Sequence, residues 1–210
     1  MPNQPRPDSN RDNRDHEKGT AVALCFGCFF MDMYFIALVA PEEINQQVLK
    51  WKNFFKERYE CSVALRSSAH ITIIPPFWMN EELENDLINS LREFSITKNK
   101  FEIALKDFAA FKPKVIFVDV VKSEILKGLY RSFADFIISQ NKFPIKKEDR
   151  PFHPHVTLAT RDLYKKAFQE AWEIFSKKKY EALWIVSGIS LLRHNKKNWD
   201  VIFTSQFVED

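Results

Sequence analysis

The order of secondary-structure elements expected from this sequence occurs twice, and the duplication constrains the fold more than any other feature. Apolar runs with alternating or helical spacing predict strand, helix, strand, helix and strand in the first half, at 34–40, 41–59, 68–74, 81–94 and 101–105. The second half repeats this order with strand, helix, strand and helix at 115–121, 124–138, 155–159 and 163–175, followed by strands near 183–192 and 200–207. Such a chain should fold as two related units.

The size and composition of the chain allow these two units to share a core. The chain has 210 residues, of which 45% are hydrophobic and 14% aromatic, so it can bury a substantial core as one domain or two closely joined lobes. We place this domain at residues 33–210, with lobes at about 33–110 and 111–210. Pro75-Pro76 should end the strand at 68–74, because proline cannot donate to a sheet ladder.

A His-X-Thr triplet occupies the same strand of each unit, as His70-Ile71-Thr72 and His155-Val156-Thr157. Side chains alternate along a strand, so the His and Thr of each triplet share one face, and the residue between them faces the other way. Two copies of one unit related by a pseudo-two-fold axis can bring equivalent residues together. We therefore expect His70 and His155 to face each other across a cleft.

Two histidines and two threonines supply what the cleavage of a phosphodiester needs without a metal or cofactor. The reaction requires a base for the attacking oxygen, an acid for the leaving oxygen and donors for the non-bridging oxygens. Imidazole titrates near neutral pH, so one ring can accept a proton while the other donates one, and the hydroxyls of Thr72 and Thr157 can donate hydrogen bonds to the phosphoryl oxygens. Which histidine is the base depends on the orientation of the substrate.

The segments around the triplets carry a family resemblance. His-Ile-Thr-Ile-Ile-Pro-Pro-Phe at 70–77 and Phe-His-Pro-His-Val-Thr-Leu-Ala at 152–159 resemble the two signature motifs of the 2H phosphoesterase superfamily, most closely its 2'-5' RNA ligase-like branch. The resemblance extends from about Tyr34 to Phe207. It implies an α+β fold, bilobal, with duplicated β-α-β-α-β units and antiparallel-rich sheets around a central cleft. It also implies enzymes that act on RNA 2',3'-cyclic phosphates or 2'-5' linkages.

The sequence suggests further substrate-binding residues beside the triplets. In relatives an Arg stands two residues after the Leu of the second motif, whereas here Thr160 stands at that place and Arg161 follows it. Arg161 is therefore a candidate for binding the phosphate. Phe77 and Phe152 could stack on a nucleobase, although core packing is the commoner use of such rings. Lysines and an arginine could line the cleft mouth or simply be solvated, at positions Lys112, Lys114, Lys146, Lys147 and Arg150.

The leading functional hypothesis is the opening of 2',3'-cyclic phosphate ends of RNA or nucleotides to 2'-phosphates, with 2'-5' ligation as the reverse reaction. One alternative is a cyclic phosphodiesterase for small nucleotides or ADP-ribose cyclic phosphate, and another is a non-catalytic RNA-binding module. The formal net charge of +3 is too small to indicate a nucleic-acid binder by its overall field. Any anion site should therefore be local.

Metal or redox chemistry is the weaker interpretation of the remaining motifs. His153 and His155 could join His70 as metal ligands, but no acidic or cysteine ligand accompanies them, so we expect no metal and no cofactor. Cys25 and Cys28 have redox or zinc spacing without a second cysteine pair. The count of three cysteines is odd and favours free thiols in a reducing compartment, from which we expect a cytoplasmic protein.

The first 32 residues form a separate extension. Residues 1–18 are polar and should be disordered, whereas the run at 21–40 is apolar enough for a membrane anchor to be considered. The preferred alternative is that residues 34–40 form a buried strand and that translation starts at Met31 or Met33, which would make the extension non-native. We expect a monomer that does not associate with a membrane.

Overall fold

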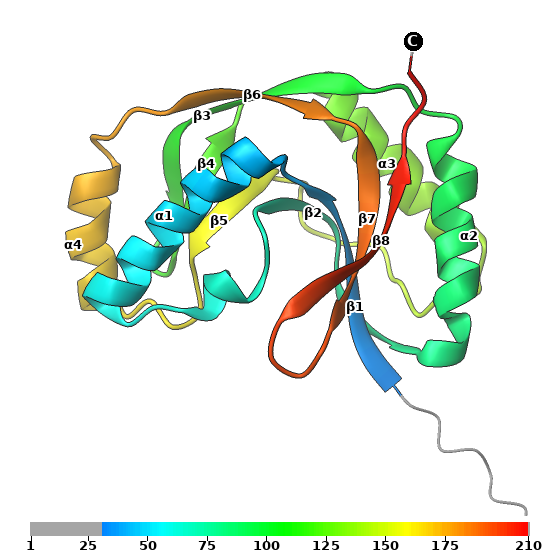
Figure 1. The fold of residues 1–210 in the computed structure, drawn as a ribbon, viewed down its shortest axis with the longest axis horizontal. Coiled ribbons are helices and arrows are strands. Elements are labelled where there is room, and N and C mark those ends of the chain that lie inside the picture. The colour runs from blue at the N-terminus through cyan, green and yellow to red at the C-terminus, as the bar shows by residue number, and fades with distance from the viewer. Residues whose placement is uncertain (1–30, 210) are drawn as a thin grey trace, which may run out of the picture.

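The computed structural model describes residues 31–209. Its helices are α1 Glu42–Tyr59, α2 Glu84–Ser95, α3 Glu124–Ser139 and α4 Lys165–Phe175, and short 3-10 helices occupy Val63–Arg66 and Glu81–Leu83. Its strands are β1 Met31–Val39, β2 His70–Asn80, β3 Phe101–Phe111, β4 Val115–Val120, β5 His155–Ala159, β6 Glu181–Val186, β7 Gly188–His194 and β8 Trp199–Gln206. The expected α+β fold is confirmed (Figure 1).

The strands form two antiparallel sheets with matching topology. The first sheet has the order β2-β1-β7-β8 and the second has the order β5-β4-β3-β6. The third strand of the first unit, β3, pairs with β4, and β7 from the second half pairs with β1. The two units therefore exchange strands, and the predicted lobe boundary near residue 110 does not separate the sheets. Hydrophobic patterning predicts that a strand exists but does not identify its partner.

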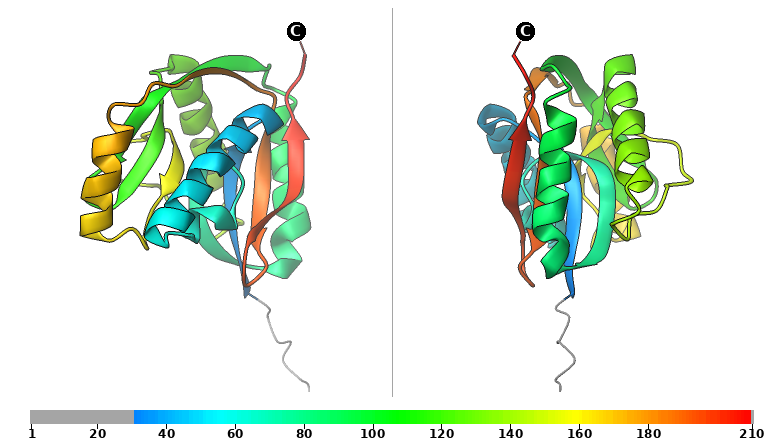
Figure 2. Two further views of the ribbon diagram at one scale, coloured as in Figure 1. Left: turned by 60° about the vertical axis from the view of Figure 1, so that its left-hand side comes forward. Right: turned by 90° about the vertical axis from the view of Figure 1, so that its right-hand side faces the viewer.

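The helices of one unit also pack against elements of the other unit. The Trp51 ring of α1 lies edge-on to Phe108 of the second sheet at 4.9 Å, and Phe55 stacks on Phe175 of α4 at 4.9 Å. At the other end of the molecule, Phe94 of α2 contacts Phe133 of α3 at 4.9 Å. Figures 1 and 2 show α1 and α4 on one side of the molecule and α2 and α3 on the other. Aromatic rings thus fill the space between each sheet and its helices.

Strand β2 does not end at Pro75-Pro76, as the sequence predicted, but continues to Asn80. Two features of the structure permit this. β2 is an edge strand, and its register against β1 shifts between Tyr34 and Ile36, opposite the two prolines. An edge strand with a bulge needs no N–H from these positions, so the prolines remain exposed without interrupting the sheet.

The single strand predicted near 183–192 is two strands that lie in different sheets. β6 ends at Val186 and β7 begins at Gly188, where the chain leaves the second sheet and enters the first. A Cβ at Gly188 would lie 2.4 Å from the carbonyl oxygen of Ser205 on β8. The glycine therefore permits the close approach of two backbones at the crossing, a role that glycine often has inside an extended segment.

The apolar run at 21–40 is only partly within the described residues. Met31–Val39 forms β1, which lies between β2 and β7 in the first sheet, so this part of the run is a strand and not a membrane-spanning helix. The predicted strand at 34–40 is thereby confirmed. None of the helices within residues 31–209 has the length and apolar character needed to cross a bilayer. The hypotheses on residues 1–30, including Cys25 and Cys28, lie outside the described residues.

Candidate active site

The two His-X-Thr triplets lie on neighbouring edge strands. β2 is the outer strand of the first sheet and β5 is the outer strand of the second, and the two strands contact each other. In both triplets the histidine and threonine are half-buried, whereas the residue between them, Ile71 or Val156, is fully buried. Alternation along each strand thus sends the apolar side chains to the core and leaves the polar side chains at the seam between the sheets.

Both histidine rings are oriented by the same hydrogen bond. Nδ1 of His70 lies 2.8 Å from the carbonyl oxygen of Ser68, and Nδ1 of His155 lies 2.7 Å from the carbonyl oxygen of His153. A carbonyl can only accept, so Nδ1 carries the hydrogen in each ring. When either ring is neutral, its Nε2 has a free lone pair, and when it is charged, Nε2 can donate a proton. Each ring is therefore equipped for proton transfer through Nε2.

Aromatic side chains restrict the positions of the two rings. The Phe35 ring lies 4.9 Å from the ring of His70. His155 contacts two rings, Phe117 at 4.9 Å and Phe111 at 5.1 Å. A ring that is held by a hydrogen bond on one side and by packing on the other loses little further freedom when a substrate binds, which favours catalysis by pre-organised groups.

The four triplet side chains line two neighbouring pockets that have Thr72 in common. His70, Thr72 and Thr157 line a pocket of about 360 Å³. Thr72 also lines the adjoining pocket together with His155. In addition to burial, the charge that His155 carries when protonated lowers the pKa of His70. The structure thus brings together the four residues that the sequence singled out.

The additional substrate-binding candidates have different positions. Arg161 lines the pocket of His70 just after β5 ends at Ala159, so strand alternation no longer restricts its direction. Phe152 lines the pocket of His155 and stacks on Tyr130 at 4.1 Å. Phe77, in contrast, is 9% exposed and packs on Tyr34 in the core, which is the commoner use of such rings that the sequence analysis weighed against base stacking. Because β2 continues past the prolines, Phe77 occupies an inward position of the strand.

Lys114 does not line either pocket of this cleft. Its N–H donates to the carbonyl of Phe111 in the turn between β3 and β4, and its side chain is exposed. The expectation that it contacts a substrate in the cleft therefore has no support from its position. Its sequence neighbourhood gave no indication of this, because a lysine in a short turn is charged and exposed whichever way the turn points.

Sequence reasoning missed several side chains that line the pocket of His70. Lys52 reaches it from α1, and His194 and Trp199 reach it from the ends of β7 and β8, with their rings 4.9 Å apart. His194 ends β7 at the hairpin that leads to β8, a place where a histidine is usually solvated. The exchange of β7 into the first sheet brings this hairpin to the cleft, and nothing in the local sequence identifies that destination.

Asp162 holds one wall of the same pocket in place. Its carboxylate accepts hydrogen bonds from the N–H groups of Ser62 and Val63 at 2.7 and 2.9 Å and from the thiol of Cys61 at 2.9 Å. Cys61 is a buried free thiol, as the sequence predicted for this cysteine. These bonds tie the loop after β5 to the 3-10 helix before β2. The carboxylate therefore links the segment that precedes the first triplet to the segment that follows the second triplet.

Burial changes the proton affinity of both histidines. Burial lowers the pKa of His70 to about 4, and the positive charges of Lys52 and His155 act in the same direction. Burial also lowers the pKa of His155 below its usual value. Both rings are therefore neutral at pH 7 in the protein alone. An anion between them would favour the charged form and raise these pKa values again.

The alternative metal site has little geometric basis. The Nε2 atom of His153 lies 3.8 Å from the carboxylate of Asp119. The centroids of the His153 and His155 rings are 6.3 Å apart. Among residues 31–209, no group of three or more His, Cys, Asp or Glu side chains is arranged to hold a metal ion. The Nδ1 atoms of His70 and His155 are already committed to carbonyl oxygens, so only Nε2 of each ring would be free for a ligand.

Known proteins resemble this chain in both sequence and fold. A Bacillus pumilus protein named "Putative phosphoesterase" is 27% identical over 112 residues, a match that covers 52% of this chain and 61% of that relative. The structure of E. coli LigT with 3'-AMP matches with a TM-score of 0.62 at 17% identity, covering 85% of this chain and 99% of LigT. The protein TT0787 of Thermus thermophilus matches with a TM-score of 0.56 at 17% identity, covering 83% and 97%.

The sequence match to the family is broader than the sequence match to the Bacillus pumilus relative. Residues 40–198 match the 2'-5' RNA ligase superfamily, a range that includes both triplets, and the solved structures show the same fold. The resemblance to 2H phosphoesterases that the two triplets indicated is thereby confirmed. The chain belongs to the 2'-5' RNA ligase superfamily.

Proposed function

We propose that this protein is a metal-independent phosphodiesterase that opens 2',3'-cyclic phosphate ends of RNA to 2'-phosphates. The observation that carries the proposal is the pair of histidines on neighbouring edge strands, each with Nδ1 bound to a carbonyl and Nε2 available, in a cleft also lined by Thr72 and Thr157. Two equivalent proton-transfer groups and two hydroxyl donors form the set that phosphodiester cleavage without a metal requires.

The reaction balances with these groups alone. One histidine accepts a proton from water at Nε2 while the water oxygen forms a bond to phosphorus. The bond from phosphorus to the 3' oxygen breaks, and the other histidine donates its Nε2 proton to that oxygen. The hydroxyls of Thr72 and Thr157 donate to the non-bridging oxygens, where negative charge increases in the transition state. The products are a 2'-phosphate and a 3'-hydroxyl, and the histidines have exchanged protonation states.

Ligation uses the same groups with a different nucleophile. If a 5'-hydroxyl of RNA takes the place of water, attack on the cyclic phosphate expels the 3' oxygen and forms a 2'-5' linkage. The pseudo-symmetry of the two histidines supports both directions, because each ring can serve as acid or base. Which ring has which role follows from the side of the cleft on which the 3' oxygen lies, and the equivalence of the two rings leaves both arrangements open.

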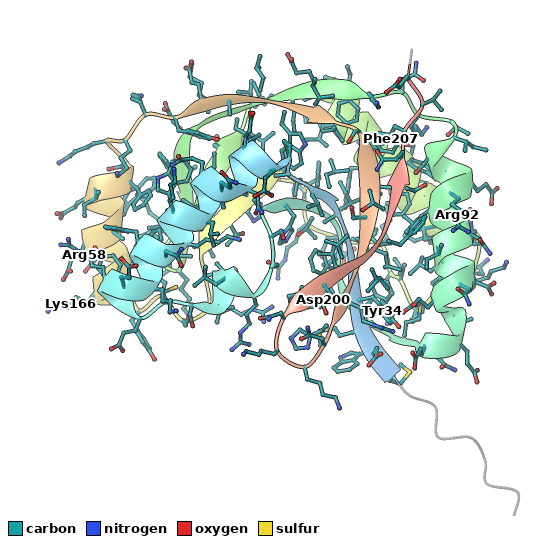
Figure 3. All side chains as sticks on the ribbon, viewed as in Figure 1. Tyr34, Arg58, Arg92, Lys166, Asp200 and Phe207 are labelled. Carbon is teal, nitrogen blue, oxygen red and sulfur yellow. The ribbon has the colours of Figure 1, made fainter. Side chains whose placement is uncertain are left out.

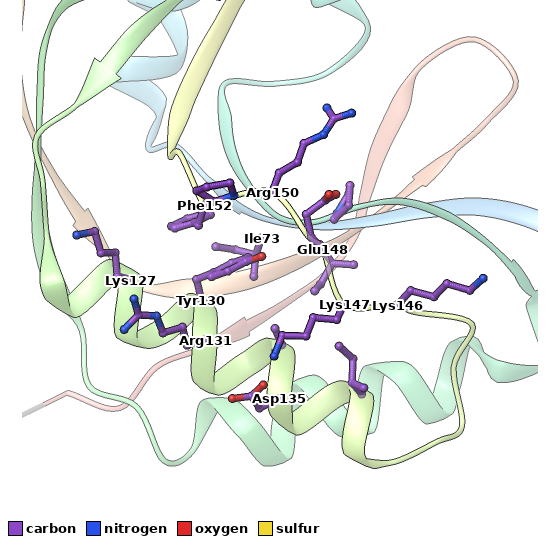
Figure 4. Close-up of a pocket in the computed structure, with 15 residues that line it drawn as sticks. Ile73, Lys127, Tyr130, Arg131, Asp135, Lys146, Lys147, Glu148, Arg150 and Phe152 are labelled. Carbon is purple, nitrogen blue, oxygen red and sulfur yellow. The ribbon is translucent and has the colours of Figure 1, made fainter.

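A basic groove next to the cleft favours RNA ends over free nucleotides. It shares a wall with the pocket of His155, formed by residues that include Tyr130 and Phe152. Lysines and arginines of α3 and of the loop before β5 line it (Figure 4), namely Lys127, Arg131, Lys146, Lys147 and Arg150. Two acids, Asp135 and Glu148, oppose these five cations. A strand whose cyclic end lies in the cleft could run across the stacked rings into this groove.

The alternative functions differ in substrate length and in turnover. A phosphodiesterase for small nucleotides or ADP-ribose cyclic phosphate would use the cleft without the basic groove. A non-catalytic RNA-binding module would bind cyclic-ended RNA and release it unchanged. LigT, which shares the fold, has been crystallised with 3'-AMP and with ATP, and these complexes support a cleft of this fold that accepts nucleotides.

One substrate panel measured in EDTA tests the proposal against these alternatives. We expect turnover of a 2',3'-cyclic mononucleotide and a higher kcat/KM for RNA oligonucleotides with the same cyclic end. Equal values for mononucleotide and oligonucleotide would favour the small-nucleotide function. Binding of cyclic-ended RNA without turnover would favour the non-catalytic RNA-binding function. Activity that disappears in EDTA and returns with a metal ion would contradict a metal-independent reaction.

Reversing two charges in the groove should weaken the preference for RNA. In the double variant Lys146→Glu, Lys147→Glu, the ratio of kcat/KM for oligonucleotide to mononucleotide should fall by at least about tenfold. Each lost phosphate contact should also reduce the salt-dependence slope of oligonucleotide binding by about 0.7. The matched control is Lys165→Glu, Lys166→Glu, which makes the same charge change on α4 at the outer edge of the molecule (Figure 3). Equal losses in both variants would point to overall charge alone.

The pH profile of kcat/KM should lie on the acidic side of an ordinary histidine. Such a profile reports the pKa values of the free enzyme, and burial lowers both of them here. As the pH rises, the ring that must be protonated therefore loses its proton before the pH reaches about 6.5, the usual histidine pKa. The alkaline limb of kcat/KM for a cyclic mononucleotide should therefore begin below this pH. An alkaline limb at or above about pH 7.5 would show that a different group supplies the proton.

A further inference from the structure

A lysine occupies a core position of α1. The buried residues of this helix are Ile44, Val48, Lys52 and Phe55, spaced as one face of a helix. Lys52 is 3% exposed, whereas Lys50 and Lys56 on the same helix are exposed. An apolar residue would be expected at this place, because lysine is among the residue types that are least often fully buried. The exception calls for a physical reason.

The charge of Lys52 has no anionic partner within the described residues. Its ammonium donates to the carbonyl oxygen of Ser67 at 2.8 Å, and no carboxylate from Met31 to Glu209 lies within ion-pair distance of it. Burial lowers the pKa of Lys52 to about 8, so the group still carries most of its charge at pH 7. An unpaired buried charge destabilises the folded state, and a bound anion would remove that penalty.

The position of this charge indicates which anion it is suited to bind. Lys52 lines the same pocket as His70, Thr72 and Thr157. After burial, the charge of Lys52 is one of the groups that lower the pKa of His70, the ring that would transfer a proton at the phosphorus. The two threonines are neutral donors, and both histidines are neutral at pH 7 before an anion binds. The pocket is also lined by Arg66 and Arg161, which are exposed, so Lys52 is its buried cation.

We propose that Lys52 is the phosphate-binding residue of this site, with its ammonium paired to a non-bridging oxygen of the cyclic phosphate. The inference rests on the proposed function and adds the group that supplies fixed positive charge. No bond forms or breaks at Lys52. Its charge increases the affinity for the anionic substrate and stabilises the additional negative charge of the transition state, in which non-bridging oxygens carry more charge than in the substrate.

A purely structural role for Lys52 would have different consequences. Its hydrogen bond to Ser67 could serve only to hold the segment that leads into β2 and orients His70 through Ser68. Removing the lysine would then lower stability and displace His70, but it would not change anion binding in a folded variant. Lys52→Met separates these roles, because methionine has a similar length, fits an apolar face and leaves no buried charge.

The test measures activity and the stabilisation by inorganic phosphate. We expect Lys52→Met to unfold at the same temperature as the wild type or higher when phosphate is absent. Its kcat/KM for a 2',3'-cyclic mononucleotide should fall by at least about 10². Phosphate should raise the unfolding temperature of the wild type but not of Lys52→Met. Lys50→Met, on the exposed side of the same helix, should behave as the wild type.

Several outcomes would overturn the proposal. Wild-type activity or wild-type phosphate stabilisation in folded Lys52→Met would show that the lysine does not bind the anion. If Lys52→Met does not fold, Lys52→Arg is the deciding variant. The wild type should lose its stabilisation by phosphate above about pH 8, where Lys52 loses its charge. In Lys52→Arg the stabilisation should persist above this pH, because the guanidinium keeps its charge. The same pH limit in both proteins would contradict the proposal. If the wild type is stabilised through Lys52 yet turns over no cyclic phosphate, the anion site stands and the proposed function fails.

Discussion

Turnover of a 2',3'-cyclic phosphate should fall by at least about 10² when His70 or His155 is replaced by alanine, because each variant loses one of the two proton-transfer groups. The structure gives a reason for similar losses at both positions. Each ring holds Nδ1 against a carbonyl, which leaves Nε2 as its proton-transfer atom. The measurement is kcat at saturating substrate in EDTA. The double variant should be only slightly worse than the single variants, since residues that act as a unit are not additive.

The folded state of these variants should remain intact. Both rings are half-buried at the seam between the sheets, and their removal leaves Ile71 and Val156 in the core. Thr72→Val and Thr157→Val should cost less than the histidine changes, because each removes one neutral donor to the phosphoryl oxygens. Full activity in either His→Ala variant, with an unchanged unfolding temperature, would rule out the two-histidine mechanism.

The residues that converge in the cleft could be predicted from the sequence because the signal was repeated. Each triplet lies in an alternating strand, and alternation fixes the face of a side chain locally. The repeat then supplied the long-range relation that one strand cannot provide. The position of Arg161 at the end of β5 also followed from local rules, since the strand ends at Ala159.

Other parts of the fold depend on contacts that local patterns do not encode. The crossing at Gly188 separates one apolar run into two strands, and only the approach of Ser205 on β8 explains the glycine. Phe77 and Phe152 flank the triplets in the same way, yet one is in the core and the other in the cleft, because β2 continues past two prolines. Lys52 did have a local signal: it is the charged residue in an otherwise apolar helical face.

Replacing Phe55 by alanine should lower the free energy of unfolding by about 3–5 kcal/mol, the usual cost of deleting a large buried aromatic side chain. Phe55 is 0% exposed and stacks on Phe175 of α4 at 4.9 Å. Phe175 in turn contacts Phe108 of β3 at 5.1 Å, so one ring connects α1 through α4 to the second sheet. A cavity at this place has rigid walls on three elements and cannot easily collapse.

This loss is large compared with the whole stability of a typical domain, about 5–15 kcal/mol. Urea unfolding should show a lower midpoint with an unchanged slope. Leu49→Ala on the same helix is the control: its side chain is 44% exposed, so the change should stay within about 0.5 kcal/mol. Because α1 also carries Lys52, phosphate should restore part of the lost stability by binding the folded state. A loss below about 1 kcal/mol would mean that the aromatic cluster repacks and does not determine the position of α1.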